Sequence, residues 1–129
     1  MPFILYDFVN EAHVNEFKKW TQDLEKNPRA KLNEKIDKLF LYGDGLHPHV
    51  LTDTDVPGIQ KLRVQGNVKL RPLLCKGPVQ VHAEYTFLMG AKEIGSKWVP
   101  ANAPKKANDK KQAVRANPKT RRIEHEKIY

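Results

Sequence analysis

The sequence predicts an α+β fold with an N-terminal strand, a helical hairpin packed on a small antiparallel sheet, and a C-terminal helix. Three observations support it. Apolar residues recur every three or four positions between 14 and 40, and they alternate with basic residues between 59 and 72. A thin apolar stripe then runs through 104–116. Because 129 residues suffice for one domain with a modest core, we expect a single domain over 1–118 and a basic tail or edge strand over 119–129.

The first two elements are a strand and a helix. The run Phe3–Phe8 is short, aromatic and β-branched, which favours a strand buried on most of its surface. Asn10 can cap the helix that follows, with Asp7 and Glu11 near its positive end. The apolar residues of this helix recur at spacings of three and four, at Val14, Phe17, Trp20 and Leu24.

A second helix is predicted directly after the first. Asn27 and Pro28 can begin it, and Gly43 is its natural end. Two helices with so short a joint are expected to form an antiparallel hairpin over the sheet. The buried stripe of the second helix is expected at Leu32, Ile36, Leu39 and Phe40. A loop rich in Gly, Pro, His and Asp then runs to Gly58 and is expected to be functional or mobile.

From residue 59 the apolar period changes to two, which indicates a β-hairpin around Gly66 and Asn67. A turn of two residues would set basic residues of one strand opposite apolar residues of the other. A loop with an odd number of residues instead sets Val64 opposite Leu70. We therefore expect a three-residue loop or a bulge. Four cations would then project from one open face, where they either bind an anion or form a solvated outer surface: Lys61, Arg63, Lys69 and Arg71.

The remaining elements are a third strand and a last helix. The third strand is expected over Glu84–Gly90, and the segment Lys97–Pro100 is expected to be irregular. Pro104 can open the last helix, which Asn117 and Pro118 would end. Cys75 lies between apolar neighbours and is expected to be a small core residue.

Charge divides the chain by position. Residues 1–58 carry seven Lys/Arg against ten Asp/Glu, 59–90 carry five against one, and 91–129 carry eleven against four. The whole net charge of +8 therefore comes from the part after Gly58. Concentrated positive charge attracts polyanions, so the second half is typical of a nucleic-acid-binding surface, with a solvated, solubilising surface as the alternative.

Several classes of protein are not indicated. A single cysteine, no signal-like segment and no apolar run of membrane-spanning length together favour a cytoplasmic protein. The chain has no Gly-rich phosphate-binding loop and no nucleophile elbow, and its five histidines lack the spacing of a zinc site. We therefore expect no metal and no cofactor.

Metal-free RNA cleavage needs cations around the phosphate, a base for the 2′-hydroxyl and an acid for the leaving oxygen. The hairpin cations and Lys92 can meet the first need. Trp98 and Tyr85 offer rings for base stacking, although an aromatic residue in a strand is more often part of the core. Candidates for proton transfer are His47, His49, Glu84, Tyr85, His125 and Tyr129.

The order of elements and four sequence segments resemble the RelE/HigB-like toxin superfamily, from Phe3 to about Asn117. The segments are residues 38–43 (KLFLYG) at the end of the helical hairpin, 59–64 (IQKLRV), 68–74 (VKLRPLL) and 87–93 (FLMGAKE). Members of the family typically cleave messenger RNA in the ribosomal decoding site, and a related ParE-like branch poisons DNA gyrase. The resemblance rests on the order and spacing of these segments.

The resemblance implies a toxin-antitoxin endoribonuclease, possibly phage-borne, whose partners are mRNA, the ribosome and an antitoxin protein. It assigns phosphate binding to Arg63, Arg71 and Lys92, and proton transfer to His125 or Tyr129 near the C-terminus. We expect further RNA contacts from Lys61, Lys69, Lys97, Arg121 and Arg122. The alternative is a non-catalytic module of the same fold that binds nucleic acid or protein, because fold does not fix function.

Overall fold

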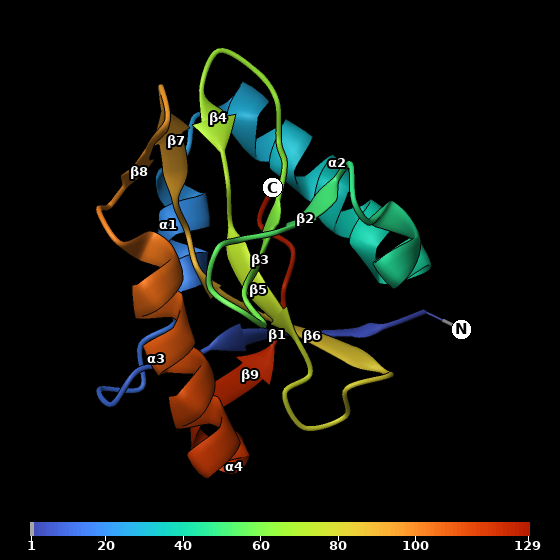
Figure 1. Cartoon of the computed structure of the whole chain (residues 1–129), viewed down its shortest axis with the longest axis vertical. Helices are drawn as coiled ribbons and strands as arrows, with labels where there is room; N and C mark the ends of the chain where they lie inside the picture. Colours follow the sequence, from blue (N-terminus) through green and yellow to red (C-terminus); the bar gives the residue numbers. More distant parts are fainter. Residues whose placement is uncertain (1) are drawn as a thin grey trace.

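A computed structural model describes residues 2–129 as an α+β protein with a six-stranded mixed sheet, a smaller three-stranded sheet and four α-helices (Figure 1). The α+β prediction is confirmed. In chain order, the elements are β1 (Ile4–Phe8), α1 (Glu16–Asp23), α2 (Lys26–Tyr42), a 3-10 turn (Gly43–Leu46), β2 (Leu51–Asp53), β3 (Gln60–Leu62), β4 (Lys69–Leu70), β5 (Leu73–Lys76), β6 (Glu84–Met89), β7 (Lys92–Ile94), β8 (Lys97–Val99), α3 (Ala103–Ala116), α4 (Pro118–Arg121) and β9 (Arg122–Glu124).

The large sheet has the strand order β2-β3-β5-β6-β1-β9. Its strands run antiparallel except for β1, which lies parallel to β6. The expected small antiparallel sheet is therefore wrong in this respect. The N-terminal strand enters the sheet between β6 and β9, and this internal position explains why Leu5, Asp7 and Phe8 are buried.

The two faces of the large sheet carry separate cores. One core joins Phe17 of α1 and Leu32 of α2 to Leu62, Leu74 and Phe87 of the sheet. The other joins α3 to the opposite face. Its central residues are Ala103, Ala107 and Val114 from the helix, with Ile59, Leu73, Cys75 and Leu88 from the strands. Alternate strand residues thus serve opposite layers, as the period of two requires.

Helix α1 begins later than predicted. Asn15, not Asn10, is its N-cap, because the Asn15 side chain accepts a hydrogen bond from the backbone N–H of Lys18 at 2.9 Å. The Asn10 side chain instead accepts from the backbone N–H groups of Ala12 and Val14 in the preceding turn. Both asparagines cap local N–H groups, and only one of them starts a helix.

Helix α2 has the predicted buried stripe apart from its last member. Leu32, Ile36 and Leu39 are buried, whereas Phe40 is 43% exposed, so its predicted core position is wrong. The helix ends at Gly43, as expected, with a positive φ of 48°. A Cβ at this position would overlap the Phe3 ring, so the close approach of that ring also favours glycine.

The basic hairpin has the predicted parity. Val64 and Leu70 form a bridge, and with Leu62 they are buried against Phe17, Ile36 and Leu39. The loop between the bridged residues spans 65–69, so it is odd, as expected, but longer than three residues. The strand then leaves the small sheet after β4 and enters the large sheet at β5, with Pro72 at the crossing. Proline has no N–H to donate, and it is tolerated there because residue 72 lies between β4 and β5, outside the paired residues of both strands.

The small sheet, β4-β7-β8, includes a segment that we expected to be irregular. Lys97–Val99 forms β8 and pairs antiparallel with β7. Helix α3 occupies the predicted span, with Asn102 at its N-cap and Pro104 in its first turn. No helix within residues 2–129 combines the length and the apolar character that a bilayer crossing requires.

The C-terminal segment packs first against β1 and then against α2. Strand β9 pairs antiparallel with β1 at the edge of the large sheet, and it covers three residues of the segment 119–129. The last residues then run beside α2 (Figure 1). Side chains one turn apart on that helix hold them: Arg29 donates to the Tyr129 carbonyl, Asn33 donates to the Ile128 carbonyl, and Asp37 pairs with Lys127.

Candidate nucleic-acid interface

A carboxylate binds two of the predicted cations at the junction of the two sheets. One oxygen of Glu93, Oε1, accepts from Lys61 Nζ at 2.7 Å and from Arg71 Nε at 3.1 Å. We call these three residues the Glu93 cluster. The Lys61 ammonium also lies over the Trp98 ring, 5.3 Å from its centroid. Two cations share one carboxylate here, so the cluster retains a net positive charge.

Strand register places Lys69 on the same side as this cluster. Lys69, Glu93 and Trp98 are directly paired across β4, β7 and β8, and directly paired residues share a face. Lys92 belongs to the neighbouring row, paired with Leu70 and Val99. Lys92 therefore lies on the opposite face of the small sheet from Lys69 and Glu93.

Arg71 is buried, not exposed on an open face as the alternation predicted. Only 2% of the residue is accessible to solvent. Besides Glu93, its guanidinium donates to the carbonyls of Val64 and Leu70 at 3.2 and 2.9 Å and to the Gln65 side chain at 3.3 Å. These bonds hold the hairpin to the small sheet, so Arg71 has a structural role that period-two alternation could not reveal.

The charges in the cluster remain ionised. Burial alone would raise the pKa of the Glu93 carboxyl, but the hydrogen bond and charge of Lys61, and then those of Arg71, outweigh it and lower that pKa. Burial lowers the pKa of the Arg71 guanidinium, while the charge of Glu93 raises it and that of Arg63 lowers it. An arginine begins so far above neutrality that it stays protonated. Glu93 is thus an acceptor at neutral pH.

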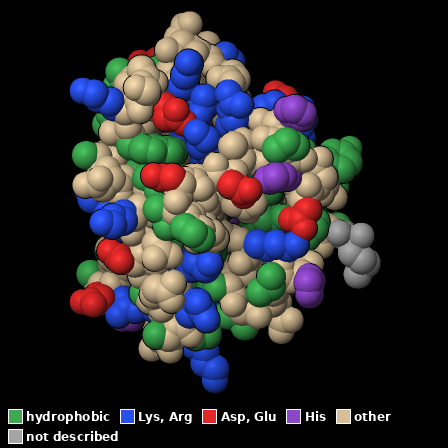
Figure 2. Space-filling model, viewed as in Figure 1, with side chains coloured by type: hydrophobic (Ala, Val, Ile, Leu, Met, Phe, Trp, Pro, Cys, Tyr) green, Lys and Arg blue, Asp and Glu red, His purple; other side chains and the backbone are tan. Residues whose placement is uncertain are grey.

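Arg63 lies at the edge of the hairpin, beside α2. It lines a hollow of about 280 Å³ together with Lys31 and Lys35 of that helix and His49 of the preceding loop. Neither Arg63 nor Lys69 has a carboxylate within 4.0 Å in the described chain. We call Lys61, Arg63 and Lys69 the basic face. Figure 2 shows Lys and Arg side chains gathered in the upper part of the molecule, around β4 and the loop that precedes it.

His125 is far from the basic face and belongs to a buried polar pair. Its Nδ1 lies 2.8 Å from Oδ1 of Asp7, and the other Asp7 oxygen accepts from the Asn15 side chain at 2.9 Å. The His125 side chain is 8% exposed and packs against Phe17 and Phe87. This pairing fastens the chain after β9 to β1, so the structure gives His125 a clear packing role.

The other C-terminal candidates are also separate from the hairpin. Tyr129 is 90% exposed and lies against α2, where its carbonyl accepts from Arg29 at 2.7 Å. Arg122 pairs with buried Glu84 and lies over the Tyr6 ring, and Arg121 approaches Glu11 at 3.9 Å. Lys97 is exposed on β8. The structure therefore does not bring His125, Tyr129, Arg121 or Arg122 to the basic face.

The other proton-transfer candidates are divided between core and loop. Tyr85 is fully buried and donates to Asp44, so its alternative role as a core residue is the one observed. His47 pairs with Asp53 at 3.0 Å in the loop before β3. Among residues 2–129, no three His, Cys, Asp or Glu side chains are grouped closely enough to hold a metal ion.

Sequence reasoning missed Glu93, Lys31 and Lys35. Glu93 lies beside Lys92 in one of the segments that carry the family resemblance, but only the pairing of β7 with β4 brings it to Arg71. The spacing of Lys31 and Lys35 indicates one face of a helix. Nothing in the sequence indicates that this face meets Arg63. The chain matches no protein-family model, no curated protein and no solved structure.

Proposed function

We propose that this protein binds RNA through the phosphate backbone, using the basic face of Lys61, Arg63 and Lys69. The observation that carries this proposal is the charge imbalance around Glu93. Lys61 and Arg71 share a single carboxylate oxygen, and Arg63 and Lys69 have no acidic partner in the described chain. Uncompensated cations repel one another, and phosphates that neutralise them release bound counterions.

The contacts support recognition of phosphate more than of bases. Trp98 contacts the basic face, but Lys61 covers its ring and the core on the α3 side of the large sheet packs against it. Base stacking needs an accessible ring face. Binding with little sequence preference follows, because phosphates fix position and carry no sequence information.

Charge-removal variants test the proposal. Affinity for a fluorescently labelled single-stranded RNA, measured by anisotropy, is expected to fall about 10-fold for Arg63→Ala and for Lys69→Ala. Lys119→Ala is the matched control, since Lys119 is an exposed cation on α4, away from the hairpin. Equal losses for all three variants would indicate a general charge effect and contradict the assignment of the basic face.

The second candidate is a RelE/HigB-like endoribonuclease, and Glu93 favours it. Glu93 is the carboxylate that lies among the hairpin cations, so it is the candidate to accept the proton of a 2′-hydroxyl, although its lowered pKa makes it a weak base. Lys61 is the candidate to donate a proton to the leaving 5′-oxygen. The observed order of a strand, two helices and then the hairpin strands agrees with the family resemblance. In that case the partners are mRNA on the ribosome and an antitoxin that covers the basic face.

Glu93→Gln separates the two candidates. The amide keeps the size and the acceptor oxygen of the side chain but cannot take up a proton. An endoribonuclease is expected to lose cleavage of ribosome-bound message by at least about 100-fold while RNA affinity persists. A wild-type protein that binds RNA but neither cleaves message nor arrests growth is the binding module of the first proposal.

A further inference from the structure

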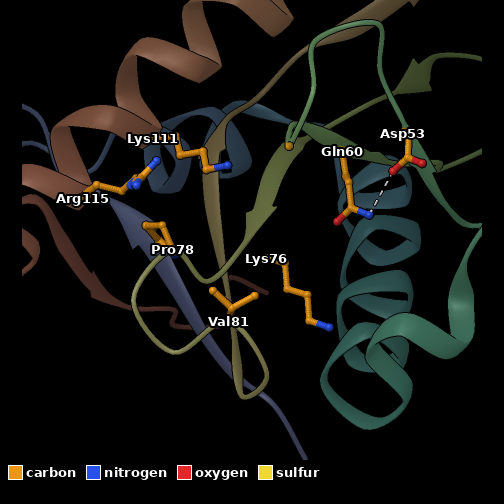
Figure 3. Close-up of a pocket in the computed structure, with 8 residues that line it drawn as sticks. Asp53, Gln60, Lys76, Pro78, Val81, Lys111 and Arg115 are labelled. Carbon is orange, nitrogen blue, oxygen red and sulfur yellow. Dashed lines mark hydrogen bonds between the residues drawn. The ribbon is translucent and has the colours of Figure 1, made fainter.

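A second basic site lies away from the hairpin, between the C-terminal half of α3 and the loop that joins β5 to β6. It is a pocket of about 440 Å³, a size typical of small-ligand sites. Figure 3 shows side chains from α3, from the 77–83 loop and from the end of the sheet around it. Of the five basic residues of α3, two line it: Lys111 and Arg115.

Lys111 and Arg115 form an unbalanced pair of cations. They are four positions apart on the same helix, so their like charges are neighbours. Within the described chain neither has a carboxylate within 4.0 Å, and both extend from α3 toward the pocket (Figure 3). The third cation, Lys76, is already paired with Asp44. The pocket thus presents two cations that an anionic group would neutralise.

The Lys111 ammonium lies close to the backbone of Gly58. A Cβ built on this glycine would come within 2.5 Å of Lys111 Nζ. Glycine is favoured there by its φ of 81°, which residues with a side chain rarely adopt.

An unpaired acceptor lies on the opposite wall. The Gln60 amide nitrogen donates to Asp53 Oδ1 at 3.2 Å, while its oxygen, Oε1, is buried and has no hydrogen-bond partner. The amide orientation is fixed chemically, because an ionised carboxylate only accepts hydrogen bonds and must face the amide NH₂. In Figure 3 the Gln60 oxygen is directed away from Asp53, on the pocket side. A buried acceptor without a partner is costly, and a ligand N–H or O–H can reach Oε1 once the Gln60 side chain turns toward the pocket.

The third wall is apolar. Pro78 and Val81 of the 77–83 loop line the pocket, and Val81 is 49% exposed although it is hydrophobic. A flat apolar group held between this loop and α3 would cover it. The ligand that fits must therefore combine an anion for the cations, an N–H or O–H donor for Gln60 and an apolar ring for the loop.

We propose that this pocket binds a nucleoside monophosphate. Its phosphate would lie between Lys111 and Arg115, its base would pack on Pro78 and Val81, and an N–H or O–H of the nucleoside would donate to Gln60 Oε1. The site is independent of the basic face, and it stands whether or not that face binds RNA.

Isothermal titration calorimetry of the full chain with AMP, GMP, CMP, UMP, ribose 5-phosphate and inorganic phosphate tests the proposal. At least one nucleotide is expected to bind about 10-fold or more tightly than inorganic phosphate, because the base and the donor add contacts. Lys111→Met and Arg115→Met are each expected to weaken that nucleotide about 10-fold. Gln60→Met is expected to weaken it about 5-fold or more, since the methionine removes the acceptor.

Lys106→Met is the matched control, because Lys106 is an exposed lysine of the same helix that does not line the pocket. Circular dichroism verifies that every variant is folded, and chemical shift changes at Gly58 and Gln60 locate the ligand. The proposal is overturned if no nucleotide binds at millimolar concentration, if inorganic phosphate binds as tightly as the best nucleotide, or if Lys106→Met weakens binding as much as Lys111→Met. If Arg63→Ala loses RNA binding but still binds the nucleotide, the result bears on the basic face and not on this pocket.

Discussion

The Arg71 Nε lies 3.1 Å from Oε1 of Glu93, and the two residues are 22 positions apart in the sequence. This contact joins the basic hairpin to the small sheet. It also divides the hairpin cations into two kinds: Arg71 is buried and structural, whereas Arg63 and Lys69 remain available to an external anion.

Arg71→Ala is expected to destabilise the fold by about 2–4 kcal/mol, because Glu93 keeps only Lys61 as a donor and the Val64 carbonyl loses the donor that Arg71 supplies. This reverses the expectation for an exposed arginine on an open face. Urea denaturation measures the free energy of unfolding. Lys69→Ala, which removes an exposed cation from the same hairpin, is expected to change it by less than about 0.5 kcal/mol. Equal stability of the two variants would contradict the structural role of Arg71.

Glu93 is expected to make stability depend on acid pH. Its pKa is lower in the folded chain than its ordinary value of 4.5, since Lys61 and Arg71 outweigh the effect of burial. Such a carboxyl stabilises the folded state above its unfolded pKa, and the stabilisation is lost as the pH falls through the folded pKa. Wild type is therefore expected to be more stable than Glu93→Gln at pH 7, with the gap closing below about pH 4.5.

Denaturation curves of both proteins between pH 2 and pH 7 measure this gap. Asp44 and Asp53 also have lowered pKa values, so wild-type stability alone does not isolate Glu93. The difference between the two proteins does. A gap that stays constant across the range would show that the Glu93 charge does not stabilise the fold.

His125→Ala is expected to destabilise the fold by about 1–3 kcal/mol, since one oxygen of Asp7 would be buried without a partner. RNA affinity is expected to be unchanged, because His125 lies away from the basic face. Thermal denaturation and anisotropy measure the two effects. Tyr129→Ala, at an exposed position of the same segment, is the control, with an expected change within about 0.5 kcal/mol. A loss of RNA binding without a loss of stability would return His125 to the functional site.

Cys75 is expected to be unreactive in the folded protein. Its thiol is fully buried, and burial raises its pKa to about 12. Labelling with a thiol-specific disulfide reagent at pH 8 is therefore expected to be on the order of 1,000-fold slower in the native protein than in guanidinium. A Cys75→Ser variant would have no thiol to label, so the unfolded wild-type chain serves as the reference. Rapid labelling of the native protein would show that the second core opens readily.

The sequence predicted the elements whose periodic pattern is strong. The burial of Leu62, Val64 and Leu70 followed from alternation and turn parity, and α3 followed from Pro104 and its thin apolar stripe. The alternation of residues along a strand predicts which face a side chain lies on, but it does not predict what packs on that face. It therefore predicted that Arg71 shares a face with Lys61, but not that β7 and β8 pack on that face.

The remaining differences have a common cause, which is contact between distant segments. The parallel pairing of β1 with β6, the contact of Asp7 with His125 across 118 positions and the approach of Lys31 to the hairpin depend on the assembled sheet. Local signals also compete, as when Asn10 and Asn15 are both good caps and packing decides which one starts the helix. The sequence therefore predicted the cations of the candidate site, Lys61, Arg63 and Lys69, but not its carboxylate, Glu93.

RNA binding by the basic face is expected to depend steeply on salt concentration. If Lys61, Arg63 and Lys69 each neutralise one phosphate of a single strand, log K against log salt has a slope of about −2, and the double variant Arg63→Ala/Lys69→Ala has a slope shallower by about 1.4. Lys119→Ala keeps the wild-type slope. A wild-type slope near zero, or a double variant whose slope equals that of wild type, would contradict RNA binding by the basic face.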